Sequence, residues 1–475
     1  MKTNIRLQKA VALGALSFFL GCVDAGTPTS NAAASKEAAL RAPSFDSVVD
    51  WNEIAEQSVV VVAKHPPPVA ALDFAILHAA IYDAVEAIDG KYRPYHVMIP
   101  GAHGSLNAAA SKAAHDILVF LFPAQQASLD ATYASYFSDH GLSTADPGVD
   151  VGAQAAAGII VLRTNDGRFP PNPPPSIGNT AIGQWRPTPS YNAGQPPAGL
   201  LPMLTPWVAN VKLFALKSND QFMPAGPTPL DSREWQKDYN ETKDFGSLDS
   251  TVRTAEQTTI GLFWADSGPL LWQRAQRDLA TRYLPGPAQS ARMFALTNLA
   301  AADAQIACWH SKETFNFWRP VTAISLGGGN PNLEADPNWK PLINTPNFPE
   351  YTSGHTTSSA AAVGVLKRFF HDRDTTFTVT SKYPWSPQTQ RTFDRFDDAL
   401  DEVIDARVWV GIHWRSSDVD GAMWGKKIAN YVFSHYLHRA DDEDEGDRAT
   451  VDNDRGPNGH DTTDPNDEGA DVSSD

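Results

Sequence analysis

The chain has 475 residues, of which 42% are hydrophobic and 20% are charged, and it contains 13 Trp, 22 Phe and 12 Tyr. These proportions support a large packed core and exclude a disordered, collagen-like or coiled-coil protein. The formal net charge of −17 argues against nucleic acid as the main partner, because phosphate backbones are bound by clustered Lys and Arg. With only Cys22 and Cys308, a framework of several disulfides is also excluded.

The first 22 residues are typical of an export signal. Three basic residues precede an apolar run at residues 11–20, which is too short to span a bilayer as a stable helix. The run ends in Phe-Leu-Gly-Cys, which is similar to a bacterial lipoprotein signal and makes Cys22 a candidate lipid anchor. Plain cleavage near Ala25 is the alternative. We therefore expect an exported protein that is periplasmic, anchored to a membrane by lipid, or extracellular.

Composition divides the rest of the chain into four parts. Residues 23–45 are small and polar, as in a linker. Residues 46–234 are predicted to form an N-terminal helical region, within which residues 166–230 hold 14 of the 36 prolines. Because proline lacks an N–H group and breaks helices, this excursion is predicted to be rigid and irregular. Residues 235–439 are predicted to form a C-terminal helical bundle. Residues 440–475, with 14 Asp and Glu against two Arg, are predicted to be a disordered acidic tail.

Helical patterns dominate the body of the chain. Residues 68–89 are apolar on most sides, as in a buried helix. Further helices are predicted at residues 108–122, 151–162, 252–264, 288–318, 353–370 and 391–410. The only clear strand pattern is a short one at residues 375–380. These patterns predict an all-α protein of two helical bundles.

The first candidate site segment is KETFNFWRP, which contains Lys312 and Arg319. Seven residues are about two helical turns, so both cations can project from one face of a helix that Pro320 then ends. Aromatic residues surround them, and a buried unpaired cation is strongly unfavourable, so the pair is expected to meet a negative group. Surface cations on an amphipathic helix are the alternative.

The second segment is FPEYTSGH, which ends at His355 and precedes a helix of small residues. A helix that begins at Ser353-Gly354 points free N–H groups outward, and its dipole favours an anion. Gly354 also allows an oxyanion to approach the backbone closely. The alternative is a simple Ser N-cap with an incidental histidine.

The third segment is ARVWVGIHW, which contains Arg407 and His413. Arg407 falls on an apolar helix face with Leu400 and Val403, so it too is expected to need a buried anion. Gly411 permits a turn that brings His413 to the same point. A histidine satisfied within the core is the alternative.

Taken together, Lys-x6-Arg-Pro, Ser-Gly-His and Arg-x5-His occur in a characteristic order and spacing. This arrangement resembles the vanadium-dependent haloperoxidases, of the secreted bacterial type, and their relatives, the type 2 phosphatidic acid phosphatases. The resemblance extends over roughly residues 68–435. It implies a site for an oxyanion, vanadate or phosphate, in the C-terminal bundle.

The resemblance implies a role for each residue of the pattern. The residues that would hold the oxyanion are Lys312, Arg319, Ser353, Gly354 and Arg407. His413 would bond the central metal of vanadate, or attack phosphate, and His355 would act as the acid and base. Lys312 would also withdraw charge during the oxidation. Arginine forks suit oxyanion edges, and imidazole serves as both ligand and nucleophile.

Three further residues match the family outside the oxyanion cradle. Trp309 and Phe348 resemble the aromatic residues beside the halide site of fungal chloroperoxidases. Asp266 resembles the aspartate that pairs with the second cradle arginine, here Arg407, although the alignment could slip by one residue. Asp303 is a further candidate, with a capping or helix-surface role as its alternative.

The function implied is a vanadate-dependent haloperoxidase that oxidises a halide with hydrogen peroxide to hypohalous acid, for transfer to a small organic acceptor. The alternatives are an acid phosphatase with a phosphohistidine intermediate at the same site, and a non-catalytic oxyanion-binding protein. Phosphatases place an aspartate four residues after the axial histidine, where this chain has Ser417 and then Asp418. That departure tilts the interpretation towards vanadate. The long excursion makes a homodimer plausible.

Overall fold

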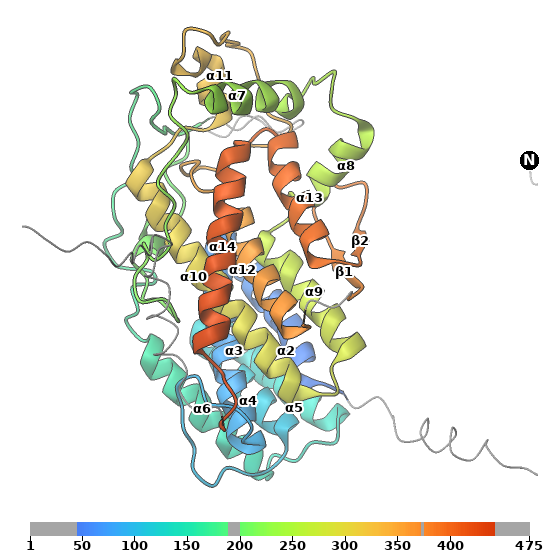
Figure 1. Ribbon diagram of the computed structural model, residues 1–475. Helices are drawn as coiled ribbons and strands as arrows, with labels where there is room; N and C mark the ends of the chain where they lie inside the picture. Colours follow the sequence, from blue (N-terminus) through green and yellow to red (C-terminus); the bar gives the residue numbers. More distant parts are fainter. Residues whose placement is uncertain (1–44, 189–199, 372–374, 442–475) are drawn as a thin grey trace, which may run out of the picture. The chain divides into compact units, whose positions relative to one another are not determined.

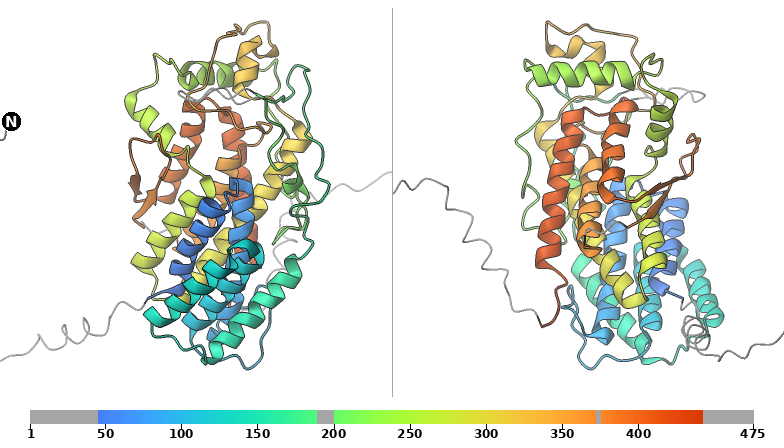
Figure 2. Two further views of the ribbon diagram at one scale, coloured as in Figure 1. Left: turned by 180° about the vertical axis from the view of Figure 1, so that it is seen from behind. Right: turned by 45° about the vertical axis from the view of Figure 1, so that its right-hand side comes forward.

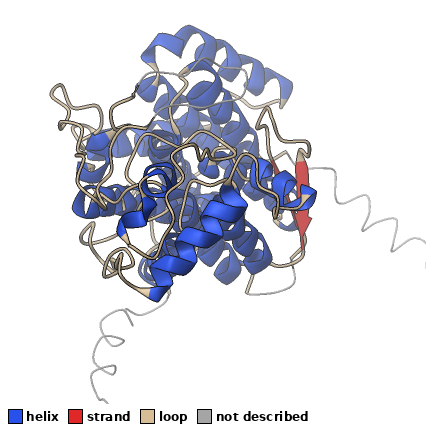
Figure 3. Cartoon of the chain, turned by 90° about the horizontal axis from the view of Figure 1, so that it is seen from above, coloured by secondary structure: helices blue, strands red, loops and turns tan. Residues whose placement is uncertain are grey.

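A computed structural model describes residues 45–188, 200–371 and 375–441 of the chain. All of them belong to one compact unit. The fold is all-α, as the sequence predicted: helices make up most of the described residues, and one two-stranded sheet lies at their edge (Figure 3). The predictions for the export signal, the linker and the acidic tail fall almost wholly outside the described residues.

The N-terminal half forms a group of helices around a central apolar one. That helix is α3 (Pro67–Asp89), which begins at two prolines and ends at Gly90 in the left-handed conformation with φ of 68°. It is long and apolar enough to cross a membrane, but its apolar stretch is wholly buried in the protein, as in a core helix. Its neighbours are α2 (Ser47–Glu56), α4 (Leu106–Leu121) and α6 (Pro147–Arg163), and α5 (Gln126–Asp139) packs on α4.

The proline-rich excursion is irregular, as predicted, in the parts that the structure describes. Its one regular element there is a short 3-10 helix, Pro206–Asn210. One of the contacts that hold it is made by Asp303, which is fully buried and accepts 2.7 Å hydrogen bonds from the backbone N–H groups of Phe214, Ala215 and Leu216. Asp303 is therefore an anchor for the excursion, and neither a cap nor a helix-surface residue.

The C-terminal half contains the remaining helices, which are α7 (Arg233–Gly246), α8 (Ala255–Phe263), α9 (Gly268–Tyr283), α10 (Pro287–Phe315), α11 (Pro320–Ser325), α12 (Gly354–Phe369), α13 (Phe396–Trp409) and α14 (Arg415–His435). Strand β1 (Phe377–Thr380) pairs antiparallel with β2 (Gln390–Phe393). The predicted helix over residues 391–410 is therefore wrong at its start, because residues 391–393 pair with β1 in the sheet and α13 begins only at Phe396.

Long helices of the two halves pack directly on one another. Helix α10 contacts both α3 and α12, and α12 packs closely against α14. Figure 1 shows α7 and α11 across the ends of α13 and α14, and Figure 2 shows the same arrangement from two other sides. The candidate residues of the sequence pattern lie at the ends of α10, α12 and α13 and in the loops that follow them.

Small residues allow α12 and α14 to approach closely. A Cβ added to Gly425 would lie 2.2 Å from the carbonyl oxygen of Thr357, and one added to Gly421 would lie 2.7 Å from the hydroxyl of the same threonine. Gly364 on α12 has the same relationship to Ala429, at 2.6 Å. These contacts fix the position of the N-terminus of α12, where Ser353 and Gly354 lie.

Candidate active site

Lys312 and Arg319 meet at the site by a different route from the one predicted. Helix α10 ends at Phe315, and Asn316 takes the left-handed conformation with φ of 46°. Arg319 is the N-cap of the next helix, which Pro320 begins. The expectation that one helix face carries both cations is therefore wrong. A turn brings them together, and both side chains are fully buried.

The ammonium group of Lys312 is bonded by protein carbonyls. Its Nζ donates to the carbonyl oxygens of Pro349 at 2.9 Å, Glu350 at 3.0 Å and Thr352. An ammonium group has three donors, so all are used by the segment that leads to α12. Burial lowers the pKa of Lys312 to about 8. In this structure Lys312 holds residues 349–352 in place, and its contact with an oxyanion stays a prediction.

Arg319 connects the second segment of the pattern to the third. Its Nε donates to the carbonyl oxygen of Phe348 at 2.9 Å, and its Nη1 donates to that of Ile412 at 2.7 Å. The same Nη1 lies 3.1 Å from Nε2 of His413. Burial, together with the charge of Arg407, lowers the pKa of Arg319 to about 9.

Arg407 reaches the site from the buried face of α13. It is 2% exposed and lies on the same side as Leu400 and Val403, as its helical spacing predicted. Its Nη1 donates to the carbonyl oxygen of Trp264 at 3.1 Å. After α13, Gly411 turns the chain with φ of 79°, and a Cβ there would lie 2.4 Å from the carbonyl oxygen of Gly246. Glycine is therefore required for the turn that precedes His413.

Three buried donors at the site have no hydrogen-bond partner among the described residues. They come from separate segments and are Nη2 of Arg319, Oγ of Ser353 and Nε of Arg407. Ser353 is the N-cap of α12, yet its side chain makes no capping bond. Its hydroxyl lies beside Asp418 and favours the ionised form of that carboxyl, but not within hydrogen-bonding geometry. Leaving a buried donor unpaired costs about 1–3 kcal/mol, and more for a charged group. An oxyanion would accept from all three, so these residues fit vanadate or phosphate.

The cationic groups act together on the ring of His413. Burial lowers the pKa of His413 well below its usual value, and the charges of Arg319, Lys312 and Arg407 lower it further. The same three charges lower the pKa of His355, which burial brings to about 3. The segments predicted to form one site therefore do converge. Both imidazoles are neutral at pH 7.

Glu350 is the residue of the site that sequence reasoning missed. Its Oε1 lies 2.7 Å from Nδ1 of His413 and also accepts from the backbone N–H of Trp414 at 3.1 Å. Glu350 is fully buried, and burial raises its pKa to about 7. Its position in FPEYTSGH, two residues after Phe348, was the available signal. An acidic residue in an apolar segment next to predicted cations is expected to pair with a basic or hydrogen-donating group of the site.

Ser417 and Asp418 lie beside the site but are not bonded to His413. The hydroxyl of Ser417 lies next to Glu350 and favours the ionised form of that carboxyl. Asp418 accepts a long bond of 3.5 Å from the hydroxyl of Thr356. Burial raises the pKa of Asp418 well above its usual value. The structure gives neither of them a hydrogen bond to His413, whose Nδ1 is bonded to Glu350.

Asp266 does not pair with Arg407. Its carboxylate bonds Arg274 at 2.7 Å and accepts the backbone N–H of Lys382 at 2.8 Å. The pairing implied by the resemblance is therefore wrong for this chain, because Arg274 on α9 is the arginine within reach. Asp266 still contacts the site through its backbone: its carbonyl oxygen lies 3.0 Å from Nε2 of His355. Because a carbonyl only accepts, Nε2 of His355 carries the proton and Nδ1 is the basic nitrogen.

Trp309 and Phe348 form an aromatic wall beside the cations. Their ring centroids are 5.0 Å apart. The ammonium of Lys312 lies 5.1 Å from the Phe348 centroid, and the guanidinium of Arg319 lies 4.8 Å from it. The excursion reaches this wall, since the carbonyl oxygen of Leu204 accepts the indole N–H of Trp309 at 3.2 Å. These contacts exclude water from one side of the cations.

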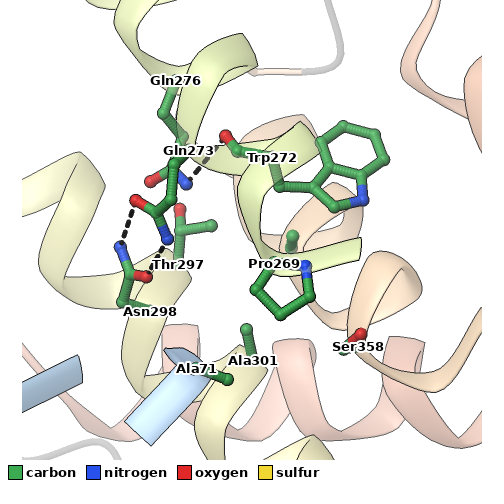
Figure 4. A pocket seen from close by; sticks show the side chains of 10 residues that line it. Ala71, Pro269, Trp272, Gln273, Gln276, Thr297, Asn298, Ala301 and Ser358 are labelled. Carbon is green, nitrogen blue, oxygen red and sulfur yellow. Dashed lines mark hydrogen bonds between the residues drawn. The ribbon is translucent and has the colours of Figure 1, made fainter. Parts of the chain in front are cut away.

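A small internal cavity lies between α9, α10 and α12 and does not belong to this site. Gln273 and Asn298 are hydrogen-bonded to each other across it, next to Trp272 and Pro269 (Figure 4). Its lining contains none of the predicted site residues. Among the described residues, no group of three His, Cys, Asp or Glu side chains is placed to bind a metal cation.

Comparisons with known proteins relate the chain to vanadium haloperoxidases. Residues 292–442 match the family model of the VCPO second helical-bundle domain. The vanadium chloroperoxidase of Curvularia inaequalis is 28% identical over 229 residues, which cover 36% of this chain and 37% of that protein. The match thus spans little more than a third of that relative's length.

Solved structures extend the likeness over most of the chain. A bacterial vanadium-dependent iodoperoxidase superposes with a TM-score of 0.69 at 25% identity, covering 82% of this chain and 96% of that one. A holo-type bacterial vanadium-dependent chloroperoxidase superposes with a TM-score of 0.64 at 18% identity, covering 80% and 94%. At this identity, the likeness to the chloroperoxidase shows a shared fold.

Proposed function

We propose that this chain, which belongs to the vanadium-dependent haloperoxidase family, binds orthovanadate in its cationic cradle and oxidises a halide with hydrogen peroxide to hypohalous acid. The observation that carries the proposal is the set of three unpaired buried donors on Arg319, Ser353 and Arg407. Most buried polar groups in folded proteins are hydrogen-bonded. Donors left open at one point from three segments are suited to an anion that joins the folded protein.

The chain's own residues would bind and orient that group. Arg319 and Arg407 would donate to its oxygens, together with the hydroxyl of Ser353 and the backbone N–H of Gly354. His413 offers Nε2 as the ligand. Bound vanadate would supply the Lewis acid that activates hydrogen peroxide.

The remaining groups would move protons and exclude water. His355 keeps Nδ1 unprotonated because Nε2 donates to Asp266, so Nδ1 is the nitrogen that can take a proton from bound hydrogen peroxide. Trp309 and Phe348 present an apolar surface next to Lys312, where a weakly hydrated halide would lie. We propose a halide as the second substrate and a small organic molecule as the acceptor of the oxidised halogen.

An acid phosphatase is the second candidate, and one observation favours it. A carboxylate bonded to Nδ1 of the axial histidine strengthens Nε2 as a nucleophile. The absence of an aspartate four residues after His413 tilted the interpretation away from phosphatase, but Glu350 supplies that carboxylate. This departure therefore no longer separates the two reactions. A non-catalytic oxyanion-binding protein is the least favoured, since binding alone needs neither histidine.

Paired assays on the apo-protein, with and without orthovanadate, separate these functions. One assay follows bromination of a phenolic dye with peroxide and bromide, and the other follows hydrolysis of a phosphate ester. Bromination that appears only with orthovanadate supports the haloperoxidase. Ester hydrolysis that orthovanadate inhibits, with no bromination, overturns it in favour of the phosphatase. If orthovanadate binds but neither activity is found, the result supports a non-catalytic oxyanion-binding protein.

The cellular location and assembly belong to the same proposal. An exported protein, periplasmic, lipid-anchored at Cys22 or extracellular, accords with the apolar run that precedes this residue. A homodimer is proposed from the length of the excursion. Mass spectrometry of the purified N-terminus and light scattering test the two statements.

A further inference from the structure

We propose that Glu350 is the positioning residue of His413 and fixes the tautomer that turns a basic Nε2 towards the cradle. This inference rests on the proposed function only in naming that cradle as an oxyanion site. The two side chains are 0% and 2% exposed, and Oε1 of Glu350 lies 2.7 Å from Nδ1 of His413. At that distance the pair shares one proton in a water-free environment.

The neighbouring arginine decides where that proton lies. Nη1 of Arg319 lies 3.1 Å from Nε2 of His413. A guanidinium has only donors, so Nε2 must be an acceptor and carries no hydrogen. A neutral imidazole then carries its hydrogen on Nδ1, where it donates to Glu350. The contacts on both ring nitrogens therefore agree on one tautomer, whose Nε2 lone pair points at Arg319, a residue of the cradle.

Glu350 is itself held from three segments. Its backbone N–H donates to the carbonyl oxygen of Phe317 at 2.9 Å, and its own carbonyl oxygen accepts from Lys312. Its carboxylate accepts from the backbone N–H of Trp414 at 3.1 Å. Because Trp414 follows His413 directly, one carboxylate oxygen fixes both the ring and the backbone next to it.

The charged groups that face the pair come from each element around it. Arg319 and Lys312 favour the ionised carboxylate of Glu350, as does the hydroxyl of Ser417. The charge of Glu350 in turn raises the pKa of the buried Asp418. The structure gives none of these groups a hydrogen bond to Nδ1, which leaves Glu350 as its partner. A ligand histidine whose other nitrogen meets a carboxylate is oriented and made more basic, and loss of such a partner weakens binding of the group by about 10–100-fold.

The test uses the full-length apo-protein and two variants of one residue. Glu350→Gln keeps an acceptor for Nδ1–H but removes the charge, and Glu350→Leu removes both. Asp420→Asn is the matched control, because this carboxylate bonds the hydroxyl of the adjacent Tyr351 at 2.7 Å and has no bond to His413. Two readouts are independent of turnover: the ¹⁵N resonances of His413, assigned with His413→Gln, and calorimetric binding of orthovanadate.

We expect the unmodified protein to show His413 as the Nδ1–H tautomer. Orthovanadate should bind about tenfold more weakly to Glu350→Gln and about 100-fold more weakly to Glu350→Leu, with no change in Asp420→Asn. Should Glu350→Leu not fold, Glu350→Gln decides the matter. An Nε2–H tautomer in the unmodified protein, or unchanged binding in Glu350→Gln, overturns the proposal.

The results that would contradict the proposed function differ from those that would contradict the role of Glu350. If the protein hydrolyses phosphate esters and does not brominate, the haloperoxidase proposal is wrong. The ¹⁵N resonances and orthovanadate binding still test the role of Glu350 in that case. If orthovanadate does not bind at all, the proposed function is wrong, and the ¹⁵N resonances alone decide the tautomer.

Discussion

Nη1 of Arg319 lies 3.1 Å from Nε2 of His413, although the two residues are 94 positions apart in the chain. A donor that faces the basic nitrogen of a neutral histidine marks the point at which one anion would meet both. The other nitrogen of that guanidinium, Nη2, is buried and unpaired among the described residues. The donors of the cradle thus come together from segments that are far apart in the chain.

The two arginines should dominate anion affinity. Replacing Arg319 or Arg407 by lysine removes the unpaired donor of each fork, and a hydrogen bond to a charged group contributes about 1.5–3 kcal/mol. We expect orthovanadate to bind about 10- to 100-fold more weakly to each variant, by calorimetry. The exposed Arg233→Lys is the control. Affinity within twofold of the unmodified protein would show that these donors do not meet the anion.

Lys312 should matter to stability as well as to activity. In Lys312→Met, three buried carbonyl oxygens lose their donor, since Nζ bonds Pro349, Glu350 and Thr352. We expect the free energy of unfolding to fall by about 2–4 kcal/mol in urea denaturation, from the cost of unpaired buried acceptors. The exposed Lys237→Met should change little. A fully stable Lys312→Met would show that the ammonium is needed only by the anion.

His355 should be needed for turnover and dispensable for binding. Its ring bonds only the carbonyl oxygen of Asp266, so its removal leaves the three unpaired donors in place. In His355→Ala we expect turnover to fall by about 10²–10⁴-fold, the usual range for a general acid or base. Orthovanadate affinity should change by less than tenfold. The exposed His435→Ala is the control. Equal losses of binding and turnover would contradict the assigned role.

Glu56 should make the protein sensitive to acid. Burial alone would raise its pKa, but bonds from Arg274, Lys382 and Arg277 outweigh burial and lower the pKa to about 2 from 4.5. A lowered folded-state pKa gives stability that is present above the unfolded value and lost as the pH falls through the folded one.

Glu56→Gln should therefore be less stable at pH 7 by about 3 kcal/mol, and the difference should shrink between pH 4.5 and pH 2. Thermal unfolding across that range measures it. The exposed Glu53→Gln on the same helix is the control. A difference that stays constant with pH would show that the ion pairs do not carry the effect.

The contact between α12 and α14 should tolerate no added methyl group. In Gly425→Ala, the new Cβ would lie 2.2 Å from the carbonyl oxygen of Thr357, which is backbone and moves only with the helix. We expect unfolding free energy to fall by about 1–3 kcal/mol, as in other overpacked cores. Orthovanadate should also bind more weakly, because α12 carries Ser353. Ser434→Ala, exposed on α14, is the control, and unchanged melting of Gly425→Ala would refute the close contact.

Much of the fold and of the residue set follows from local rules. The apolar face of residues 68–89 requires a buried helix, which is α3. Proline and small residues mark the starts of α11 and α12. The spacing of the three motifs selects cations and imidazoles that do converge, because each motif lies at a helix end or in the turn that follows it.

The hydrogen-bond partners of the buried charged residues could not be predicted from such local rules. Asp266 was expected to meet Arg407 and instead bonds Arg274. Glu350 had no assigned role and bonds His413, 63 residues away. Arg319 and Lys312 were placed on one helix that in fact ends between them. Local sequence constrains a side chain only with respect to its own turn of helix. The nearest opposite charge depends on which loops the packing of α10, α12 and α13 brings together.

The sequence by itself therefore determined the elements and the chemistry available to the site: helices from the period of their apolar residues, and an anion site from cations in apolar surroundings. Only the tertiary structure decided which donors stay unpaired and which carboxylate orients His413. The reason is physical. Helix formation depends on neighbours a few residues apart, whereas hydrogen bonding of a buried charge depends on distances of about 3 Å between segments that meet only after the core has packed.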